Sequence, residues 1–388
     1  MAFREPDGAH AQPATLPAAI AAQAAIRPDG VALRHKRLGI WHVLTWRDLA
    51  ARVAGLAQGL ARRGVGRGNA LVLLAHPRLE ALLLTLAAQS LGARAVPLDP
   101  LQPRERLHDL LAGLQPRFVF ADDQAMVDRV LAAVPAPELL AYADARGLAQ
   151  YRHPALLPCA ALDEAGAAPA PAPAPAADDT AFVFYRLDGD GQLEAQRHSH
   201  RNLLAEARAL VRHEALSACE DALAARAFSG GEVARYLLGP WLAAGFTLNF
   251  PENADTRDND RRELGPTLVL GTRATYARVA QLAFDGLPAP GTLVRRLVDA
   301  ALSPAAGPLV RGAGRWLVRR PLREVLGFTR LRTPLLVGDA LDVRTRDLLH
   351  ALGIDVHAWP ELHGWLPGRA DDTLAATGSA PDLRWRPA

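Results

Sequence analysis

Residues 181–202 read AFVFYRLDGDGQLEAQRHSHRN and combine a buried strand, a glycine-bearing loop and the start of a helix. The apolar, aromatic run 181–185 has the length and composition of a buried strand. The pattern of residues 202–211 predicts a helix. A loop between such a strand and a helix is a common phosphate site, because backbone N–H groups and the helix N-terminus point toward the anion. This segment therefore predicts an α/β fold and a first candidate site.

Short apolar strands and amphipathic helices alternate on both sides of this segment. Further strands are predicted at residues 70–74, 95–98, 118–120, 246–250, 267–270, 335–337 and 354–356. Helices are predicted at residues 45–60, 78–91, 104–114 and 344–352, with Thr45 as an N-terminal cap. Such alternation is typical of parallel sheets covered on both faces. The 388 residues exceed the roughly 250–300 that one core supports. We therefore expect an α/β fold with two parallel-sheet subdomains flanked by helices.

A low-complexity stretch divides the chain. Residues 165–177 read AGAAPAPAPAPAA, and alternating proline excludes both helix and regular strand pairing. We therefore predict an extended Ala/Pro linker at 165–177. The first α/β subdomain is then expected at 1–164, the second at 178–365, and an irregular tail at 366–388.

The composition argues against several protein classes. Lys and Arg total 44, Asp and Glu total 41, and the net charge of +3 is spread along the chain, so we expect no nucleic-acid partner. The two cysteines, Cys159 and Cys219, exclude a disulfide framework and a Cys-based zinc cluster. No apolar run reaches about 18 residues and the N-terminus lacks a signal-peptide pattern. We therefore expect a cytoplasmic protein without a transmembrane segment. Lys36 is the only lysine.

Several motifs, taken in order, resemble the adenylate-forming (AMP-binding) superfamily, which includes the acyl-CoA synthetases. Its members carry a Tyr-Thr-Ser-Gly-Thr-Thr-Gly-x-Pro-Lys-Gly loop ending near Ser-His-x-Asn. The matching residues here are Tyr185, Gly191, Ser199, His200 and Asn202. Residues 92–100, GARAVPLDP, resemble another family segment. The chain resembles most the subgroup of long-chain fatty-acyl-CoA synthetases. The motifs of that subgroup occur here in the same order, at residues 250–252, 262–267 and 273–276.

The resemblance implies ATP, Mg²⁺ and coenzyme A as the family's cofactors, but the phosphate loop departs from the family pattern. Active members form an acyl-adenylate and hold the ATP phosphates with hydroxyl groups and a lysine. Here Asp188 replaces a glycine, Asp190 a threonine and Glu194 the lysine. At about 4 Å and an effective dielectric constant near 20, each like-charge contact would cost on the order of 4 kcal/mol. The degenerate phosphate loop comprises Tyr185, Gly189, Gly191, Glu194, Ser199 and His200.

A second family site also departs from its pattern. The family's Gly-Gly-Ala-Pro-Leu turn is replaced by a turn that contains Gly338, Asp339 and Ala340. In the Gly-Tyr-Gly-x-Thr-Glu motif, an aromatic ring stacks on adenine and the glutamate helps to hold Mg²⁺. Here Gly364 stands at the glutamate position. The candidate adenine or acyl pocket comprises Gly338, Asp339, Ala340, Trp359 and Glu361. Two interpretations of Trp359 have equal support: a ring that stacks on adenine, and a side chain packed in the core.

Neither histidine pattern predicts a metal site. His198 and His200 have no third ligand near in sequence, so we expect exposed side chains at a helix start. His357, Glu361 and His363 lack the i, i+4 histidine pair of a zinc-binding helix. A basic helix carries Arg311, Arg315, Arg319 and Arg320. We interpret it as a solvated face in preference to a peripheral membrane contact.

The leading hypothesis is a pseudoenzyme that keeps the scaffold of the family's N-terminal domain. We assign no catalytic residue and expect no bound cofactor. The family's C-terminal domain is expected to be absent, because too few residues follow position 365. One alternative is a functional fatty-acid adenylating ligase completed by a separate C-terminal partner protein. The other is a non-catalytic module for a fatty acyl ligand or a protein, which predicts a closed apolar tunnel between the subdomains.

Overall fold

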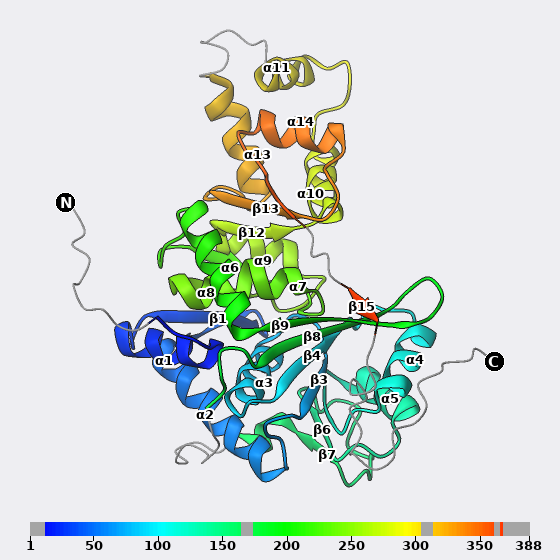
Figure 1. Ribbon diagram of the computed structural model, residues 1–388. Helices are drawn as coiled ribbons and strands as arrows, with labels where there is room; N and C mark the ends of the chain where they lie inside the picture. Colours follow the sequence, from blue (N-terminus) through cyan, green and yellow to red (C-terminus); the bar gives the residue numbers. More distant parts are fainter. Residues whose placement is uncertain (1–11, 164–173, 304–312, 361–364, 368–388) are drawn as a thin grey trace.

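The computed structural model describes residues 12–163, 174–303, 313–360 and 365–367, which form two large sheets with helices on their faces (Figure 1). The seven-stranded sheet has the order β14 (His357–Trp359), β13 (Thr333–Val337), β12 (Leu268–Gly271), β10 (Asp221–Leu223), β11 (Thr247–Phe250), β1 (Val31–Arg37) and β2 (Ile40–Thr45). The eight-stranded sheet has the order β15 (Leu366–Pro367), β9 (Leu193–Ser199), β8 (Thr180–Leu187), β4 (Arg94–Leu98), β3 (Ala70–Leu74), β5 (Phe118–Ala121), β6 (Leu139–Tyr142) and β7 (Leu156–Pro158). Among these strands, neighbours pair in parallel except at β1–β2, β8–β9 and β9–β15. The predicted α/β fold is confirmed.

Helices connect these strands and cover the sheets. They are α1 (Leu16–Ile26), α2 (Trp46–Arg62), α3 (Leu79–Ser90), α4 (Arg104–Leu114), α5 (Gln124–Ala133), α6 (His200–His213), α7 (Gly231–Val233), α8 (Gly239–Ala244), α9 (Arg257–Leu264), α10 (Arg273–Asp285), α11 (Leu293–Leu302), α13 (Arg320–Val325) and α14 (Val343–Ala351). Short helical segments are η1 (Cys159–Leu162), η2 (Ala234–Leu238) and η3 (Arg315–Arg319). Thr45 caps α2 as predicted, in a reciprocal pair with Asp48. In the described part of the chain, no helix combines the length and apolar character needed to cross a bilayer.

Each sheet contains strands from both sides of the predicted linker at 165–177. β1 and β2 precede the linker but join the seven-stranded sheet, whereas β8 and β9 follow it and join the eight-stranded sheet. The expected division into 1–164 and 178–365 therefore does not coincide with the division between the sheets. Composition marks where the chain cannot form regular structure, but it carries no information on strand pairing over long sequence distances. Residues 164–173 of the predicted linker lie outside the described residues.

Two predicted boundaries differ for local reasons. The loop predicted over 186–202 is a hairpin, because β9 pairs antiparallel with β8 along the register from Thr180–Ser199 to Leu187–Leu193. The strand predicted at 354–356 begins instead at His357. Gly353, at φ +72°, ends α14, and the N–H of Ile354 still bonds to the carbonyl of Leu349 (2.9 Å). Of the predicted irregular tail, residues 366–367 form β15, and 368–388 lie outside the described residues.

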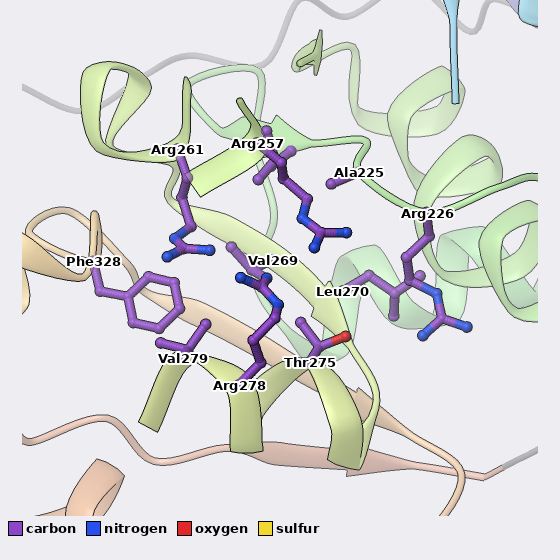
Figure 2. A pocket seen from close by; sticks show the side chains of 11 residues that line it. Ala225, Arg226, Arg257, Arg261, Val269, Leu270, Thr275, Arg278, Val279 and Phe328 are labelled. Atoms are coloured by element: carbon purple, nitrogen blue, oxygen red, sulfur yellow. The ribbon is translucent and has the colours of Figure 1, made fainter. Parts of the chain in front are cut away.

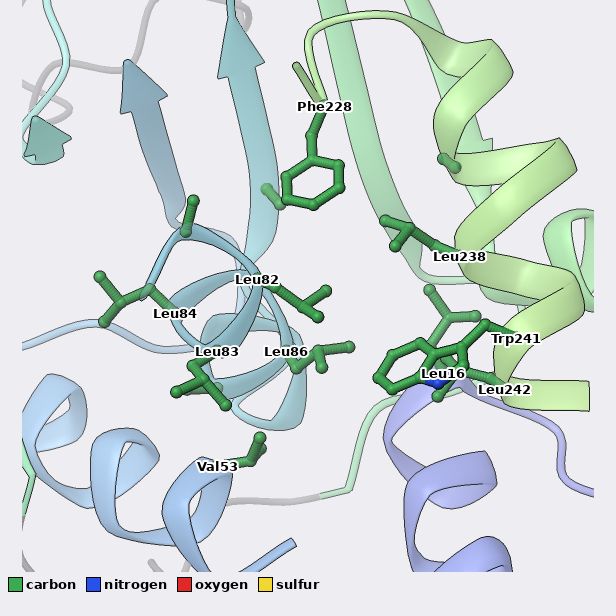
Figure 3. Close-up of a cluster of buried hydrophobic side chains, with 14 of the residues drawn as sticks. Leu16, Val53, Leu82, Leu83, Leu84, Leu86, Phe228, Leu238, Trp241 and Leu242 are labelled. Carbon is green, nitrogen blue, oxygen red and sulfur yellow. The ribbon is translucent and has the colours of Figure 1, made fainter. Parts of the chain in front are cut away.

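One apolar cluster includes residues of both sheets and holds them together. Figure 3 shows Leu82 and Leu86 of α3 facing Leu238 and Trp241, which lie on η2 and α8. The indole rings of Trp46 and Trp241 stack with centroids 5.1 Å apart, and the Trp241 N–H donates to the carbonyl of Ala32 (3.0 Å). Stacked, hydrogen-bonded rings of this size fix relative orientation as well as burying area. The two sheets are therefore packed as one body around the site described next.

Candidate functional site

A cleft of about 1440 Å³ lies where the carboxyl ends of strands from both sheets meet. Its walls include residues that follow β3, β4, β5, β10 and β11, within the ranges 76–80, 99–102, 122–123, 225–230 and 250–255. Ligands of α/β proteins bind at this edge of parallel sheets, because the loops that leave neighbouring strands open a crevice there. The cleft is therefore the candidate functional site.

The β8–β9 hairpin contributes Tyr185 and Arg186 to the cleft wall. Its turn is closed by Asp188, whose carboxylate accepts the backbone N–H groups of Asp190 (2.9 Å) and Gln192 (2.8 Å). The N–H of Asp188 donates to the carbonyl of Gln192 (2.9 Å). Backbone N–H groups of this kind form the cradle of a phosphate loop. In this turn they are bonded within the protein.

Glu194, which stands at the predicted lysine position, lies opposite Arg186 in the hairpin. The guanidinium of Arg186 donates from Nε to Glu194 (2.7 Å) and lies over the Trp365 ring, 4.2 Å from its centroid. Gly189 and Gly191 lie in the turn and are not among the residues that line the cleft. Arg186 is thus paired with a carboxylate and an aromatic face.

Ser199 and His200 have structural roles at the start of α6. The Ser199 hydroxyl accepts the N–H of Asn202 (3.2 Å) and caps the helix. His200 is 1% exposed, and its Nδ1 accepts the N–H of Leu16 (3.3 Å). His198 is also buried, with its ring edge-on to Phe184. The expectation that both histidines are exposed is wrong, because β9 turns His198 into the core and α1 covers His200.

The candidate adenine or acyl pocket is not part of this cleft. Gly338, Asp339 and Ala340 follow β13 and do not belong to the cleft lining. Trp359 donates its indole N–H to Glu214 (3.0 Å), and its ring contacts those of His213 and Tyr236, with centroids 5.3 and 5.7 Å away. These contacts are those of a packed residue. Glu361 lies outside the described residues.

No metal centre is found in the described part of the chain, where no three His, Cys, Asp or Glu side chains are grouped to hold an ion. His357 instead bonds to Glu214 (2.6 Å). His363 and Glu361 of the alternative zinc pattern lie outside the described residues. Lys36 lines the cleft, but its ammonium group donates to Asp260 (2.9 Å) and Glu263 (2.5 Å).

The sequence analysis missed a charged cluster in the cleft around Asp122. The Asp122 carboxylate, 4% exposed, accepts from the ring of His76 (2.7 Å) and from Arg78 (2.7 Å), and Arg78 also donates to Glu80 (2.8 Å). Burial would raise the pKa of Asp122, but the hydrogen bond from His76 and the charge of Arg78 together lower it. The hydrogen bond to Asp122 raises the pKa of His76 against the effect of burial.

In this cluster two carboxylates, those of Asp122 and Glu80, pair with Arg78 and His76 at the cleft wall, so its charges are balanced within the protein. A signal for it was present in the sequence. His76 and Asp122 each follow a predicted parallel strand by one or two residues, at the edge where ligands bind.

Comparisons with known proteins agree with the architecture. The family described as AMP-binding enzyme matches residues 20–357. An uncharacterized Mycobacterium tuberculosis protein is 36% identical over 122 residues, which cover 31% of this chain and 68% of that protein. The 2-succinylbenzoate–CoA ligase of Escherichia coli K12 is 40% identical over 80 residues, 21% of this chain and 18% of the ligase. A Rhodopseudomonas palustris structure described as a long-chain-fatty-acid CoA ligase has a TM-score of 0.65 at 19% identity, covering 88% of this chain and 74% of that one.

Proposed function

Because the chain belongs to the family of AMP-binding enzymes, we propose that it is an acyl-CoA-synthetase-like protein impaired in ATP-dependent adenylation. One observation carries the proposal: the hairpin at the predicted phosphate position is closed on itself. Asp188 occupies the backbone N–H groups of the turn, and Glu194 neutralises Arg186. A triphosphate would meet these carboxylates at a site with no free lysine.

The electrostatic balance supports this proposal. A phosphate group gains from each N–H donor or cation that faces it and loses against each carboxylate nearby. Asp188 and Glu194 would need to release their partners before any phosphate could replace them. The hairpin residues therefore do not fit an ATP phosphate, and we derive no catalytic step through ATP, Mg²⁺ or coenzyme A.

The substrate class follows only from the resemblance to long-chain fatty-acyl-CoA synthetases. Residues 250–252, which contribute to that resemblance, line the cleft, and the Glu252 carboxylate accepts the N–H groups of Leu38 (2.7 Å) and Gly39 (3.1 Å). Charged side chains such as Arg52, Arg78 and Asp122 also line the cleft. This lining does not favour the alternative of an acyl-binding module with a closed apolar tunnel.

The first test is ATP–pyrophosphate exchange by the full chain with a panel of fatty acids. We expect no exchange above a protein-free blank. Robust exchange by the unmodified chain would contradict impaired adenylation and favour a working ligase, including one completed by a separate C-terminal partner.

The second test restores the family charge with Glu194→Lys. This substitution removes the pairing of Arg186 and places two cations beside the turn, so Mg-ATP should bind at least about ten-fold more tightly. Titration with Mg-ATP monitored by thermal unfolding measures the change. The matched control is Glu105→Lys on α4, which makes the same charge change at an exposed position. Equal gains in both variants would mean that net charge, and not the hairpin, limits ATP binding.

A further inference from the structure

Four arginines surround a second, smaller pocket of about 50 Å³ at the carboxyl ends of β10 and β12: Arg226, Arg257, Arg261 and Arg278 (Figure 2). The helical segments that follow these two strands lie on opposite faces of the sheet. η2 and α8 after β10 pack in the cluster that contains Leu270, whereas α10 after β12 packs in the cluster that contains Val269. A crevice at such a reversal is the usual ligand position in an open α/β sheet.

Two of these arginines share a single carboxylate. Asp258 accepts from Nη1 of Arg261 (2.6 Å) and also from Arg278. Arg257 lies near enough to Arg278 for the two charges to repel, and its buried Nε has no partner within the described residues. No acidic residue is part of the described pocket lining. Three cations and one carboxylate leave an excess of positive charge.

Arg261 is the most constrained of the four. It is 2% exposed, its Nε donates to the carbonyl of Leu326 (2.8 Å), and its guanidinium lies 5.3 Å from the Phe328 ring centroid. Its buried Nη2 has no partner among the described residues. Figure 2 shows the guanidinium groups of Arg257, Arg261 and Arg278 directed toward the same space. A buried donor on a cation is costly to leave unbonded.

The pKa values of these arginines also indicate that their positive charges are poorly compensated. Burial lowers the pKa of Arg261 to about 10; the nearby Asp258 opposes this effect and Arg278 adds to it. Burial and then Arg278 lower the pKa of Arg257. Burial also lowers the pKa of Arg226, against the charges of Glu232 and Asp99. An anion between Arg257, Arg261 and Arg278 would reverse the unfavourable balance.

We propose that this arginine pocket binds a phosphate group. Guanidinium groups match phosphate oxygens in geometry, and an excess of several positive charges suits a dianion better than a carboxylate. The pocket, of about 50 Å³, has room for a compact group of this kind. Arg226 and Arg257 also line the large cleft, so the phosphate is either free or carried by a molecule that extends into the cleft. This site goes beyond the proposed function and does not depend on it, since the hairpin takes no part.

The test is calorimetric titration of the full chain with inorganic phosphate, and separately with glycerol phosphate, at constant ionic strength. We expect saturable binding with one site. Arg257→Gln should weaken this binding by about ten- to a hundred-fold, because one charge-assisted contact is lost. The control is Arg262→Gln on the same helix, whose side chain bonds to the carbonyl of Val325 outside the pocket. This control removes the same charge and should bind phosphate as the unmodified chain does.

Tighter binding of glycerol phosphate than of phosphate identifies a phosphomonoester as the ligand, and equal binding identifies the phosphate group alone. A second readout needs no substitution: phosphate should protect the partly exposed Arg257 from modification by phenylglyoxal, as read by peptide mass spectrometry. Absence of saturable binding overturns the proposal. The proposal is also overturned if Arg262→Gln weakens phosphate binding as much as Arg257→Gln does, or if acetate binds as tightly as phosphate. Either result would mean that the protein attracts anions in general.

Discussion

His200 matches a family motif residue, yet its ring is buried and accepts a backbone N–H from α1. Burial lowers its pKa to about 4, so the folded protein keeps this ring neutral. In the unfolded chain the same ring takes up a proton near pH 6.5. Between these two values the unfolded state binds more protons than the folded state. The free energy of unfolding therefore falls as the pH falls through this window.

We predict that His200→Gln removes roughly 3 kcal/mol of this acid sensitivity between pH 6.5 and pH 4. A glutamine carbonyl can accept the N–H of Leu16, but it does not titrate. Urea unfolding at a series of pH values measures the effect as a flatter curve for the variant. His108→Gln, at an exposed position on α4, serves as the control and should keep the slope of the unmodified chain. Identical slopes for all three proteins would show that His200 is not the acid-sensitive group.

At the scale of elements, the β8–β9 hairpin depends on Asp188, which bonds two backbone N–H groups of its turn. We predict that Asp188→Ala lowers the free energy of unfolding by about 1 kcal/mol, because water replaces these bonds at an exposed turn. Amide hydrogen exchange at Asp190 and Gln192 should become faster. Asp190→Ala removes the same charge from the same turn without removing an acceptor, and should leave exchange at Gln192 unchanged. Equal acceleration in both variants would assign the effect to charge.

The hairpin also shows why some elements could be predicted and others could not. α2 was predictable because Thr45 signals its start locally, and the cap forms as expected. β9 was missed because its sequence, LEAQRHS, has a mixed polar pattern that becomes a strand only against β8. The spacing of Arg257 and Arg261 is visible in the sequence, but the helix α9 that places them on one face was not predicted. Arg278 joins them through Asp258, a contact between α9 and α10 that no local pattern shows.

At the scale of the whole molecule, the two sheets share one apolar cluster, and the cleft lies between their carboxyl edges. Trp46 follows β2 and Trp241 lies on α8, so their stacked rings pack together the helices that cover the two sheets. The sequence predicted two sheets and placed the division between them at the linker. In the structure, strands from both sides of the linker share a sheet: β1 and β11 pair in parallel although more than two hundred residues separate them in the chain.

We predict that Trp241→Ala lowers the free energy of unfolding by about 3–5 kcal/mol, since the substitution removes a fully buried ring and leaves a cavity. Because the ring belongs to a cluster common to both sheets, the loss should be cooperative. Hydrogen exchange should become faster in both β3 and β12, and both should exchange at the rate set by global unfolding. The exposed Trp316→Ala on η3 provides the control and should change neither strand. Acceleration confined to β12 would mean that the sheets unfold independently, and the cleft between them would then lack the rigid walls that a ligand site requires.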